Sequence, residues 1–407
     1  MAETKSRSKR LITTVGIIFL VLGIILYFVK EPMGLNRKIY DLPVFLIIIG
    51  ICAAIKGFMA KDKTEEEAAL AGKTFTEFLT NNAILIAMLV LVVVICILQP
   101  RFMQIRVALD ILTQSSTKLI MALGICFALL IAGTDLSAGR MVGLAAVISA
   151  SMMQTATYAN RFFPDLPQVA VWIPIVAAVL ACMVCGALNG FLVAKYEMHP
   201  FIATLATQVM IYGACSLYFD MPPNNSQPIG GIRPDFAQIG QLRLFNGLWK
   251  GFPGISILIL ISIVICIAIW FILNKTVFGK NVYAIGGNRE AAVVAGINVF
   301  RNIMFIFILA SFLYGIAGVL EAARTAGATN NYGNGYETDA IAACVVGGVS
   351  MSGGIGKVGG IVMGVLIFTV IQYGLQFINV SPMWQQVIKG VIIAVAVAID
   401  LTKYRRK

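Results

Sequence analysis

The chain has 407 residues, of which 59% are hydrophobic and only 12% are charged. A soluble globular domain is about 25% charged, so this chain has too few charges to cover a soluble surface of its size. The composition therefore disfavours soluble enzymes, nucleic-acid-binding domains and disordered scaffolds. The apolar runs lack the alternation of membrane β-strands, and they predict an all-α, polytopic membrane protein.

Twelve apolar stretches are predicted as transmembrane helices, because about 20 apolar residues cross the hydrocarbon core of a bilayer. They are 11–29, 42–60, 83–99, 118–133, 137–157, 169–194, 200–219, 252–273, 302–320, 337–350, 358–379 and 384–402. The first follows a cluster of cations, as in a signal peptide. However, it is longer than an ordinary signal sequence and lacks a small-x-small cleavage site, so it is predicted to be retained.

The cations set the predicted orientation of these helices. The net charge of +12 comes from Lys and Arg residues in loops and tails. This pattern is typical of membrane proteins and does not indicate nucleic-acid binding. With both termini in the cytoplasm, the cytoplasmic side holds most of the 31 Lys and Arg residues, Arg140 among them. The bias favours cytoplasmic termini.

Two longer polar segments separate the predicted helices. Residues 61–82 contain a capping box, Thr64-Glu65-Glu66-Glu67, which predicts an amphipathic connector helix on the inner membrane surface. Residues 220–251 are rich in Pro, Gly and Asn and are predicted to form the largest outer loop, without regular structure. Long loops are often functional, so this one is either a docking surface for an extracytoplasmic partner or a plain connection.

No motif in the sequence supports catalysis or a metal site. The sequence Gly354-Ile-Gly-Lys-Val-Gly359 fits G-x-G-x-x-G, but no strand precedes it, so it predicts a tight turn between two helices. The one His, His199, has no cluster of Cys or acidic residues beside it in the sequence. The pair Cys182 and Cys185 lies within an apolar run, where Cys behaves as a small hydrophobic residue. We therefore expect no enzyme activity and no metal.

Ionisable residues are rare inside the predicted helices, although an ion-coupled transporter usually needs them there. Lys389 follows Trp384 in the last helix and can extend towards the membrane interface. Asp135 and Asp339 each begin a new apolar stretch. Each either caps a helix N-terminus, where negative charge is favourable, or lines a pathway.

A short helix is predicted in the cytoplasmic segment before residue 302. Asn288 is a good N-cap, Glu290 would lie in the first turn, and Gly296 would end the helix. A helix of this length is marginal in water by itself. It is interpreted either as a helix that docks into a partner or as an ordinary surface helix.

The residues Glu290-Ala291-Ala292 and, three residues later, Gly296 resemble the E-A-A-x3-G loop of ATP-binding cassette importer permeases. Segments 133–140, 283–288 and 339–348 resemble the ribose/xylose/galactose branch of bacterial sugar permeases, and most of all its galactose and methyl galactoside subfamily. The resemblance covers about 83–407. It implies a ten-helix permease core there, with 1–82 as an N-terminal extension containing two extra helices.

The resemblance also implies the partners. A second copy of the chain would form a homodimer in the bacterial inner membrane, surrounded by lipid. A periplasmic sugar-binding protein would deliver a monosaccharide, with galactose or a methyl galactoside favoured. A cytoplasmic ATPase would hold ATP and magnesium, so this chain would bind no cofactor itself and no nucleic acid. The predicted ATPase-coupling residues are Gly287, Asn288, Arg289, Glu290, Ala291, Ala292 and Gly296.

A sugar that crosses lipid must exchange water for fixed hydrogen-bond partners, because unpaired polar groups there cost several kcal/mol. Neutral polar residues inside the predicted helices are therefore candidates for the pathway, namely Asn189, Thr204, Thr207, Gln208 and Gln372. Asp135 and Asp339 are added to them because each lies at a break in an apolar run. Thr204, Thr207 and Gln208 are spaced to share one helix face. The alternative for such residues is hydrogen bonding between helices.

The core is predicted to contain five helices before and five after segment 220–251. An odd number in each half implies two halves of inverted topology, with Thr134-Asp135 and Thr338-Asp339 at equivalent positions. Two rival functions remain. One is a secondary sugar transporter driven by ions, and the other is a membrane-bound binding or assembly protein without transport.

Overall fold

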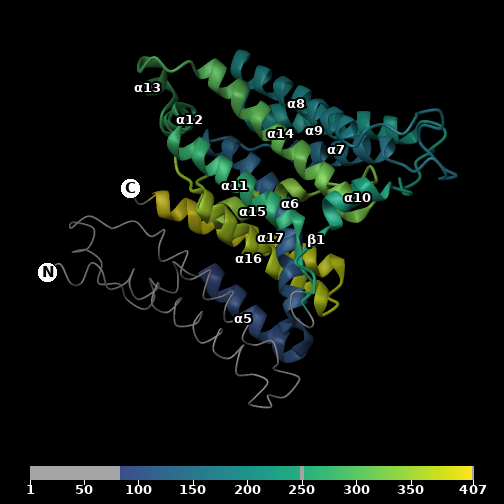
Figure 1. Ribbon diagram of the computed structural model, residues 1–407. Helices are drawn as coiled ribbons and strands as arrows, with labels where there is room; N and C mark the ends of the chain where they lie inside the picture. Colours follow the sequence, from purple (N-terminus) through teal and green to yellow (C-terminus); the bar gives the residue numbers. More distant parts are fainter. Residues whose placement is uncertain (1–82, 248–251, 406–407) are drawn as a thin grey trace. The chain divides into compact units, whose positions relative to one another are not determined.

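The computed structural model describes residues 83–247 and 252–405 (Figure 1). The predicted helices at 11–29 and 42–60 and the connector at 61–82 lie outside the described residues. The described part is mostly helical. Its α-helices are α5 (Ala83–Leu98), α6 (Ile105–Leu130), α7 (Ala138–Met152), α8 (Trp172–Lys195), α9 (Pro200–Asp220), α10 (Pro234–Gln241), α11 (Ile257–Lys275), α12 (Val277–Gly287), α13 (Arg289–Val294), α14 (Val299–Thr325), α15 (Tyr336–Val346), α16 (Val358–Phe377) and α17 (Pro382–Arg405).

A 3₁₀ turn, η2 (Pro100–Met103), and two short strands complete the described elements. The strands β1 (Arg243–Leu244) and β2 (Ile255–Ser256) pair antiparallel, with Arg243 opposite Ser256. Six described helices are long and apolar enough to cross a membrane, namely α6, α8, α9, α11, α14 and α16. The membrane-protein class is thus supported by the described helices, while the predicted total of twelve extends beyond them.

Local sequence signals explain several helix starts. Asn298 caps α14 by accepting a hydrogen bond from Arg301 N at 2.9 Å. Pro200 is the first residue of α9, a position that needs no N–H donor. His199 accepts a hydrogen bond from Phe201 N through Nδ1, so the one His of the chain serves as a helix cap.

Two predictions about element boundaries are wrong. Helix α6 begins at Ile105, well before the predicted start at 118, because its first turns carry polar residues that lower the hydropathy without breaking the helix. Segment 220–251 is not without regular structure, since it contains α10. Phe236 and Gly240 of α10 are buried, so packing stabilises a helix that is too short to be evident from its sequence.

The chain divides into two compact units, which are described separately here. The first contains the described residues up to Ile111 together with Thr369–Val391. Its core includes Ile95 and Phe102, both fully buried. Phe102 packs edge-to-face against Phe377 with ring centroids 5.2 Å apart. This aromatic contact joins η2 to the end of α16.

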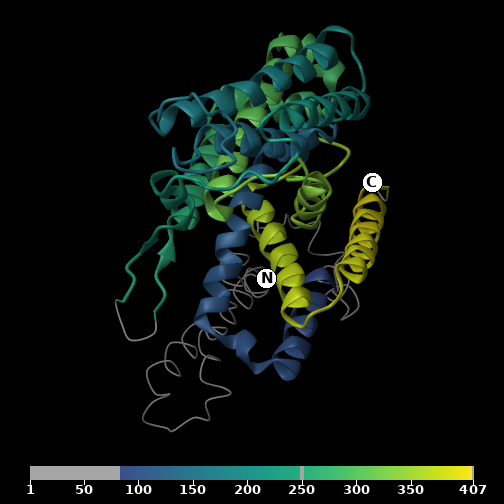
Figure 2. The same cartoon turned by 90° about the vertical axis from the view of Figure 1, so that its right-hand side faces the viewer.

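The second unit contains Leu112–Phe368 together with the described residues from Ile392 onward, and it is built around α14. Figures 1 and 2 show α8, α9 and α14 side by side in one bundle. Small residues permit the close approach. A Cβ on Gly186 of α8 would lie only 1.9 Å from Ser311 Oγ of α14, and one on Gly318 of α14 would lie 2.3 Å from the carbonyl oxygen of Val142 in α7. Close backbone approach through glycine is a common basis of helix association in membranes.

Helices α7 and α15 are too short to span about 30 Å of hydrocarbon, since a helix rises about 1.5 Å per residue. Each follows a long helix and an irregular segment, 131–137 before α7 and 326–335 before α15. Irregular backbone is tolerated at membrane depth only where protein or a water-filled cavity satisfies its polar groups. The two segments are therefore places to look for function.

The packing of α8 on α14 is testable with two glycine variants. Gly186→Ala should lower the free energy of unfolding by about 1–3 kcal/mol, because the new methyl group collides with α14. Gly213→Ala on α9 is the matched control, since its Cβ would meet no atom within 4 Å. It should be neutral or stabilising by up to about 1 kcal/mol. Thermal unfolding in detergent, followed by size-exclusion chromatography, measures both. Equal melting temperatures would contradict the packing argument.

Candidate functional site

The predicted short helix is present as α13 and has both of its expected caps. Asn288 Oδ1 accepts a hydrogen bond from Ala291 N at 2.9 Å, and Glu290 lies in the first turn. Gly296 has φ +80°, and a Cβ there would meet no atom within 4 Å. Its N–H bonds to the Val293 carbonyl and the next N–H, of Ile297, bonds to the Ala292 carbonyl. This is a Schellman cap, so Gly296 is required for its left-handed backbone and not for space.

The outer face of α13 is apolar and exposed. Val293 is 57% exposed and Val294 is 89% exposed, whereas Ala292 is buried. Arg289 of α13 forms an ion pair with Glu197 in the α8–α9 connection, with an N–O distance of 3.1 Å. The helix is thus held on one side and presents two valines on the other.

A second helix, α12, precedes α13 and was not predicted. Three glycines within α12 weaken the helical signal of its sequence, and burial of Val282 and Ile285 stabilises it instead. A Cβ on Gly286 would lie 1.6 Å from the Leu130 carbonyl oxygen, so α12 rests directly on the end of α6. Figure 1 shows α12 and α13 together at one end of α14, with α10 at the other.

The G-x-G-x-x-G sequence forms part of the tight turn before α16, as predicted, and this turn holds α12. Gly354 N donates to the Leu130 carbonyl at 2.9 Å. Tyr283 of α12 donates its hydroxyl to the Gly356 carbonyl at 3.0 Å. Burial raises the pKa of Tyr283 to about 12, so the hydroxyl stays protonated near neutral pH and keeps donating. The turn at 350–357, α12 and the end of α6 therefore form one connected structure.

The irregular segment 131–137 continues directly from that end of α6 and carries Asp135, which is completely buried. Its carboxylate accepts hydrogen bonds from the Ser137 backbone and hydroxyl at 3.0 and 2.5 Å, and from the Tyr314 hydroxyl at 3.1 Å. Ser137 is the N-cap residue of α7, so Asp135 acts on the start of that helix through Ser137. All of these donors are uncharged groups.

Three of the predicted pathway residues meet around this segment. Asn189 Nδ2 donates to Ser137 Oγ at 2.9 Å, and Asn189 Oδ1 has no hydrogen-bond partner among the described residues. Thr204 accepts from Leu136 N at 3.1 Å, and its hydroxyl lies within hydrogen-bond distance of the Pro200 carbonyl of its own helix, at 2.9 Å, and of the Thr134 carbonyl, at 3.1 Å. Asp135, Asn189 and Thr204 thus join α7, α8 and α9 through hydrogen bonds.

The remaining predicted residues lie apart from this cluster. Thr207 is buried on the same helix as Thr204, with its hydroxyl bonded to the Ala203 carbonyl, and Gln208 is half-buried. Asp339 lies in the first turn of α15, where its charge favours the helix. Gln372 belongs to the other compact unit. Within the described residues, no group of three His, Cys, Asp or Glu side chains is arranged to hold a metal ion.

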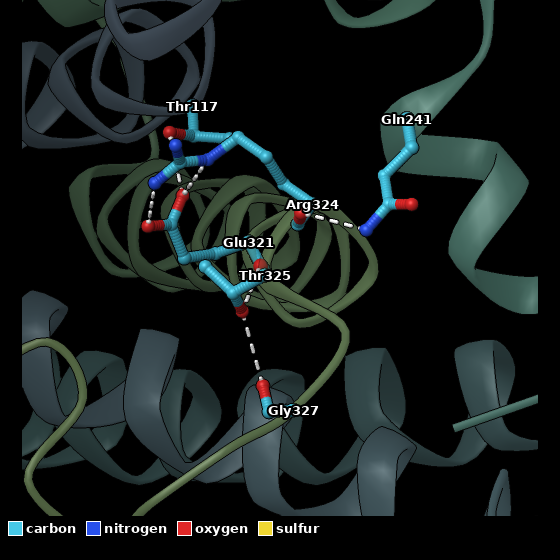
Figure 3. A network of polar contacts seen from close by, with 6 residues as sticks. All are labelled: Thr117, Gln241, Glu321, Arg324, Thr325 and Gly327. Carbon is cyan, nitrogen blue, oxygen red and sulfur yellow. Dashed lines mark hydrogen bonds and ion pairs between the residues drawn. The ribbon is translucent and has the colours of Figure 1, made fainter. Parts of the chain in front are cut away.

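The sequence alone did not reveal a buried ion pair near the far end of α14 (Figure 3). Glu321 is 3% exposed and accepts hydrogen bonds from Arg324 through both carboxylate oxygens and from the Thr117 hydroxyl at 3.0 Å. Gln241 of α10 donates to the Arg324 carbonyl at 3.1 Å. Glu321 was missed because it lies just beyond the predicted end of its helix at 320. The one sequence signal for the ion pair was the i, i+3 spacing between Glu321 and Arg324.

Arg140 forms contacts that the sequence did not reveal. It lies in the first turn of α7, within the predicted helix 137–157. There its guanidinium donates to Asn334 Oδ1 at 2.9 Å and lies 4.2 Å from the centre of the Tyr212 ring. Glu337 of α15 is also buried beside α7, because a Cβ on Gly139 would lie 2.1 Å from Glu337 Oε2.

The link between Asp135 and Asn189 is testable through Ser137. Ser137→Ala removes the hydroxyl that joins these two buried groups and should cost about 1–2 kcal/mol of stability. Ser149→Ala is the control, because the buried Ser149 hydroxyl bonds only to carbonyls of its own helix. That variant should unfold close to the wild-type temperature. Thermal unfolding in detergent compares the two, and an equal effect would contradict the role assigned to Ser137.

The chain is similar in sequence to permeases of known transport systems. The family model described as "branched-chain amino acid transport system / permease component" matches residues 107–397. The galactose/methyl galactoside import permease protein MglC of Haemophilus influenzae is 46% identical over 340 residues, covering 84% of this chain and 99% of the relative. The MglC protein of Escherichia coli is 44% identical with the same coverage.

The ribose import permease protein RbsC of Bacillus subtilis is 35% identical over 322 residues, covering 78% of this chain and 92% of the relative. No solved structure matches the chain. These similarities confirm the resemblance to sugar permeases that the sequence motifs indicated. The chain is similar both to the family model of branched-chain amino acid permeases and to sugar import permeases. It therefore belongs to this family of transport permeases.

Proposed function

We propose that this chain is the membrane permease of an ATP-driven sugar importer and that it transports galactose or methyl galactosides. The observation that carries the proposal is the exposed, doubly capped helix α13 in a chain that aligns with 99% of a galactose permease. Ion-coupled transport gives no reason for this helix. The chain itself hydrolyses no ATP, and it binds no cofactor, since ATP and magnesium belong to a separate ATPase.

The contacts of α13 support a route for coupling. An ATPase that binds Val293 and Val294 moves α13, and α12 follows because Asn288 is the single residue that joins the two helices. Helix α12 presses on Leu130 at the end of α6, directly before the segment that holds Asp135. ATP binding to the ATPase would thus rearrange the cluster of Asp135, Asn189 and Thr204. No ligand needs to bind at these three residues.

The assembly we propose has two copies of this chain in a bacterial inner membrane. Residues 83–407 form the permease core with two inverted halves, and 1–82 are an extension. The order of a long helix, an irregular segment and a short helix occurs twice, in α6–α7 and α14–α15, and supports the inverted repeat. A periplasmic binding protein docks on the side of α10, which is anchored to the end of α14 by Gln241.

Reconstitution tests the proposed function directly. Vesicles containing the chain, its ATPase and its sugar-binding protein should accumulate labelled galactose only when ATP and binding protein are both present. Uptake that persists without ATP and is abolished by dissipating the ion gradient would establish the secondary transporter instead. ATP hydrolysis without uptake of galactose or methyl galactoside would contradict the proposal.

The coupling role of Gly296 is testable with two substitutions of different backbone preference. Gly296→Val should reduce the sugar transported per ATP severalfold, because a β-branched residue resists the left-handed conformation by about 1–2 kcal/mol. Gly296→Asn is the matched control, since Asn tolerates that conformation and the space is open. Binding-protein docking should survive in both. Wild-type coupling in Gly296→Val would refute the assignment.

The proposed orientation is testable by thiol labelling in intact cells. Glu197 lies beside α13, and Asp165 lies in the exposed segment between α7 and α8. A membrane-impermeant maleimide should label Asp165→Cys from outside and Glu197→Cys only after permeabilisation, in each case above the wild-type background. The reverse pattern would invert the orientation and place both termini outside.

A further inference from the structure

The segment before α15 turns back along α7. A Cβ on Gly143 would lie 2.3 Å from the Tyr332 carbonyl oxygen, and one on Gly139 would lie 2.3 Å from the Gly333 carbonyl oxygen. The two glycines are four residues apart and so share one face of α7. Residues 332–333 therefore run along one turn of α7 before α15 begins at Tyr336.

This contact lies at membrane depth. Gly318 of α14 lies level with Val142 of α7, because a Cβ on Gly318 would lie 2.3 Å from the Val142 carbonyl oxygen. Because α14 ends at Thr325, the first turn of α7 lies about 10 Å or more inside that end. Irregular backbone at such a depth lines protein or a water-filled cavity, because lipid cannot satisfy its polar groups.

Polar side chains gather around this segment from α7, α9 and α15. We call this set the polar strip, and its members are Arg140, Tyr212, Ser216, Asn330, Asn334 and Glu337. Arg140 bonds to Asn334, and Asn330 Nδ2 lies 3.5 Å from Ser216 Oγ. Tyr212 is 44% exposed, with the Arg140 guanidinium near its ring. The strip joins segments of the chain that are more than a hundred residues apart.

The strip does not suit a lipid-facing surface. Ionisable residues at membrane depth face the protein interior or a water-filled cavity, since exposure to hydrocarbon is costly. Asn334 is exposed and Arg140 and Asn330 are half-buried, although other residues of the same segments are packed. By contrast, Asp135, Asn189 and Thr204 are all completely buried. The polar strip is therefore the more accessible of the two polar groups in this unit.

Two atoms of the strip lack partners. Arg140 Nη1 and Glu337 Oε2 are both buried and form no hydrogen bond among the described residues. Glu337 as a whole is 7% exposed. Buried polar atoms are nearly always bonded, so each such atom is a candidate for a ligand or water contact. One is a donor and the other an acceptor, which matches a hydroxyl group because a hydroxyl both donates and accepts.

We propose that the polar strip contacts the sugar during transport, with Arg140 and Glu337 binding a hydroxyl and Tyr212 packing against the apolar face of the ring. This rests on the proposed function and adds residues to it. The strip contains one cation, Arg140, and one anion, Glu337. Their charges offset each other, so the strip does not require a charged substrate. Its amides, hydroxyl and aromatic ring supply the directional bonds and the flat apolar surface of a site for a neutral sugar.

Transport by reconstituted vesicles tests the strip. The complete importer is assembled with its ATPase and binding protein, and uptake of labelled galactose, methyl galactoside and leucine is measured together with ATP hydrolysis. Tyr212→Leu and Glu337→Gln should each lower galactose uptake about tenfold, while ATP hydrolysis stimulated by the loaded binding protein stays within about twofold. The ratio of galactose to methyl galactoside uptake should also change in Tyr212→Leu.

Matched controls separate sugar contact from structural damage. Tyr212→Phe keeps the ring and should recover most of the uptake that Tyr212→Leu loses. Phe201→Leu removes an aromatic residue that is 45% exposed at the start of the same helix, outside the strip, and should transport normally. Normal uptake in Tyr212→Leu and Glu337→Gln would overturn the proposal that the polar strip contacts the sugar. Equal losses of uptake and assembly in the variants and the controls would overturn it too, and neither result would affect the proposed function. Wild-type vesicles that import leucine and no galactose would overturn the proposed function as well.

Discussion

Helix α14 can pack against its neighbours only where small residues leave room for its backbone. Glycines provide that room on α6 and α8, and on α14 itself where it meets α7. Gly124 faces Tyr314, Gly186 faces Ser311, and Gly318 faces Val142. Without a hydrophobic effect between helices in lipid, such close packing and hydrogen bonds between helices must supply the association energy. Asp135 and the network around Glu321 both bond directly to α14.

The same helix joins the two ends of the unit. At one end it follows α12 and α13, and Asn302 lies close to Asn281 of α12. At the other end, Glu321, Arg324 and Thr117 form a buried network, to which Gln241 attaches α10 (Figure 3). Loss of one partner of a buried ion pair is costly, because the other charge is left uncompensated. The Gln241 hydrogen bond and the close approach of Gly240 to the Arg324 backbone favour α10 and α14 moving together, which suits a protein that must coordinate events on two sides of a membrane.

The two groups of polar residues differ in what they can do. Asp135, Asn189 and Thr204 are buried and largely bonded to protein, so they suit a joint that holds three helices in one arrangement. The polar strip is partly exposed and retains an unpaired donor and acceptor in Arg140 and Glu337. A permease needs both kinds of group, since a rearranging joint and a weak substrate contact are separate requirements. Both groups surround irregular segments that precede a short helix.

The sequence by itself determined the membrane class, a helix at each of the ten predicted spans from residue 83 onward, and both caps of α13. These features depend on local properties, namely apolar runs, the Asn288 side chain and the backbone freedom of Gly296. The caps were predictable because their partners lie within a few residues. The family resemblance likewise rested on short local motifs.

Only the tertiary structure decided which polar residues meet. Arg140 was predicted near the cytoplasmic end of the helix at 137–157, but no local signal indicated its pairing with Asn334, which lies far along the chain. Glu321 was omitted because it follows an apolar run, yet Thr117 and Arg324 bury it. Helices α10 and α12 lack a clear local signal because packing supplies their stability. Contacts between distant residues depend on how helices approach one another, and glycine positions along α6, α8 and α14 control that approach.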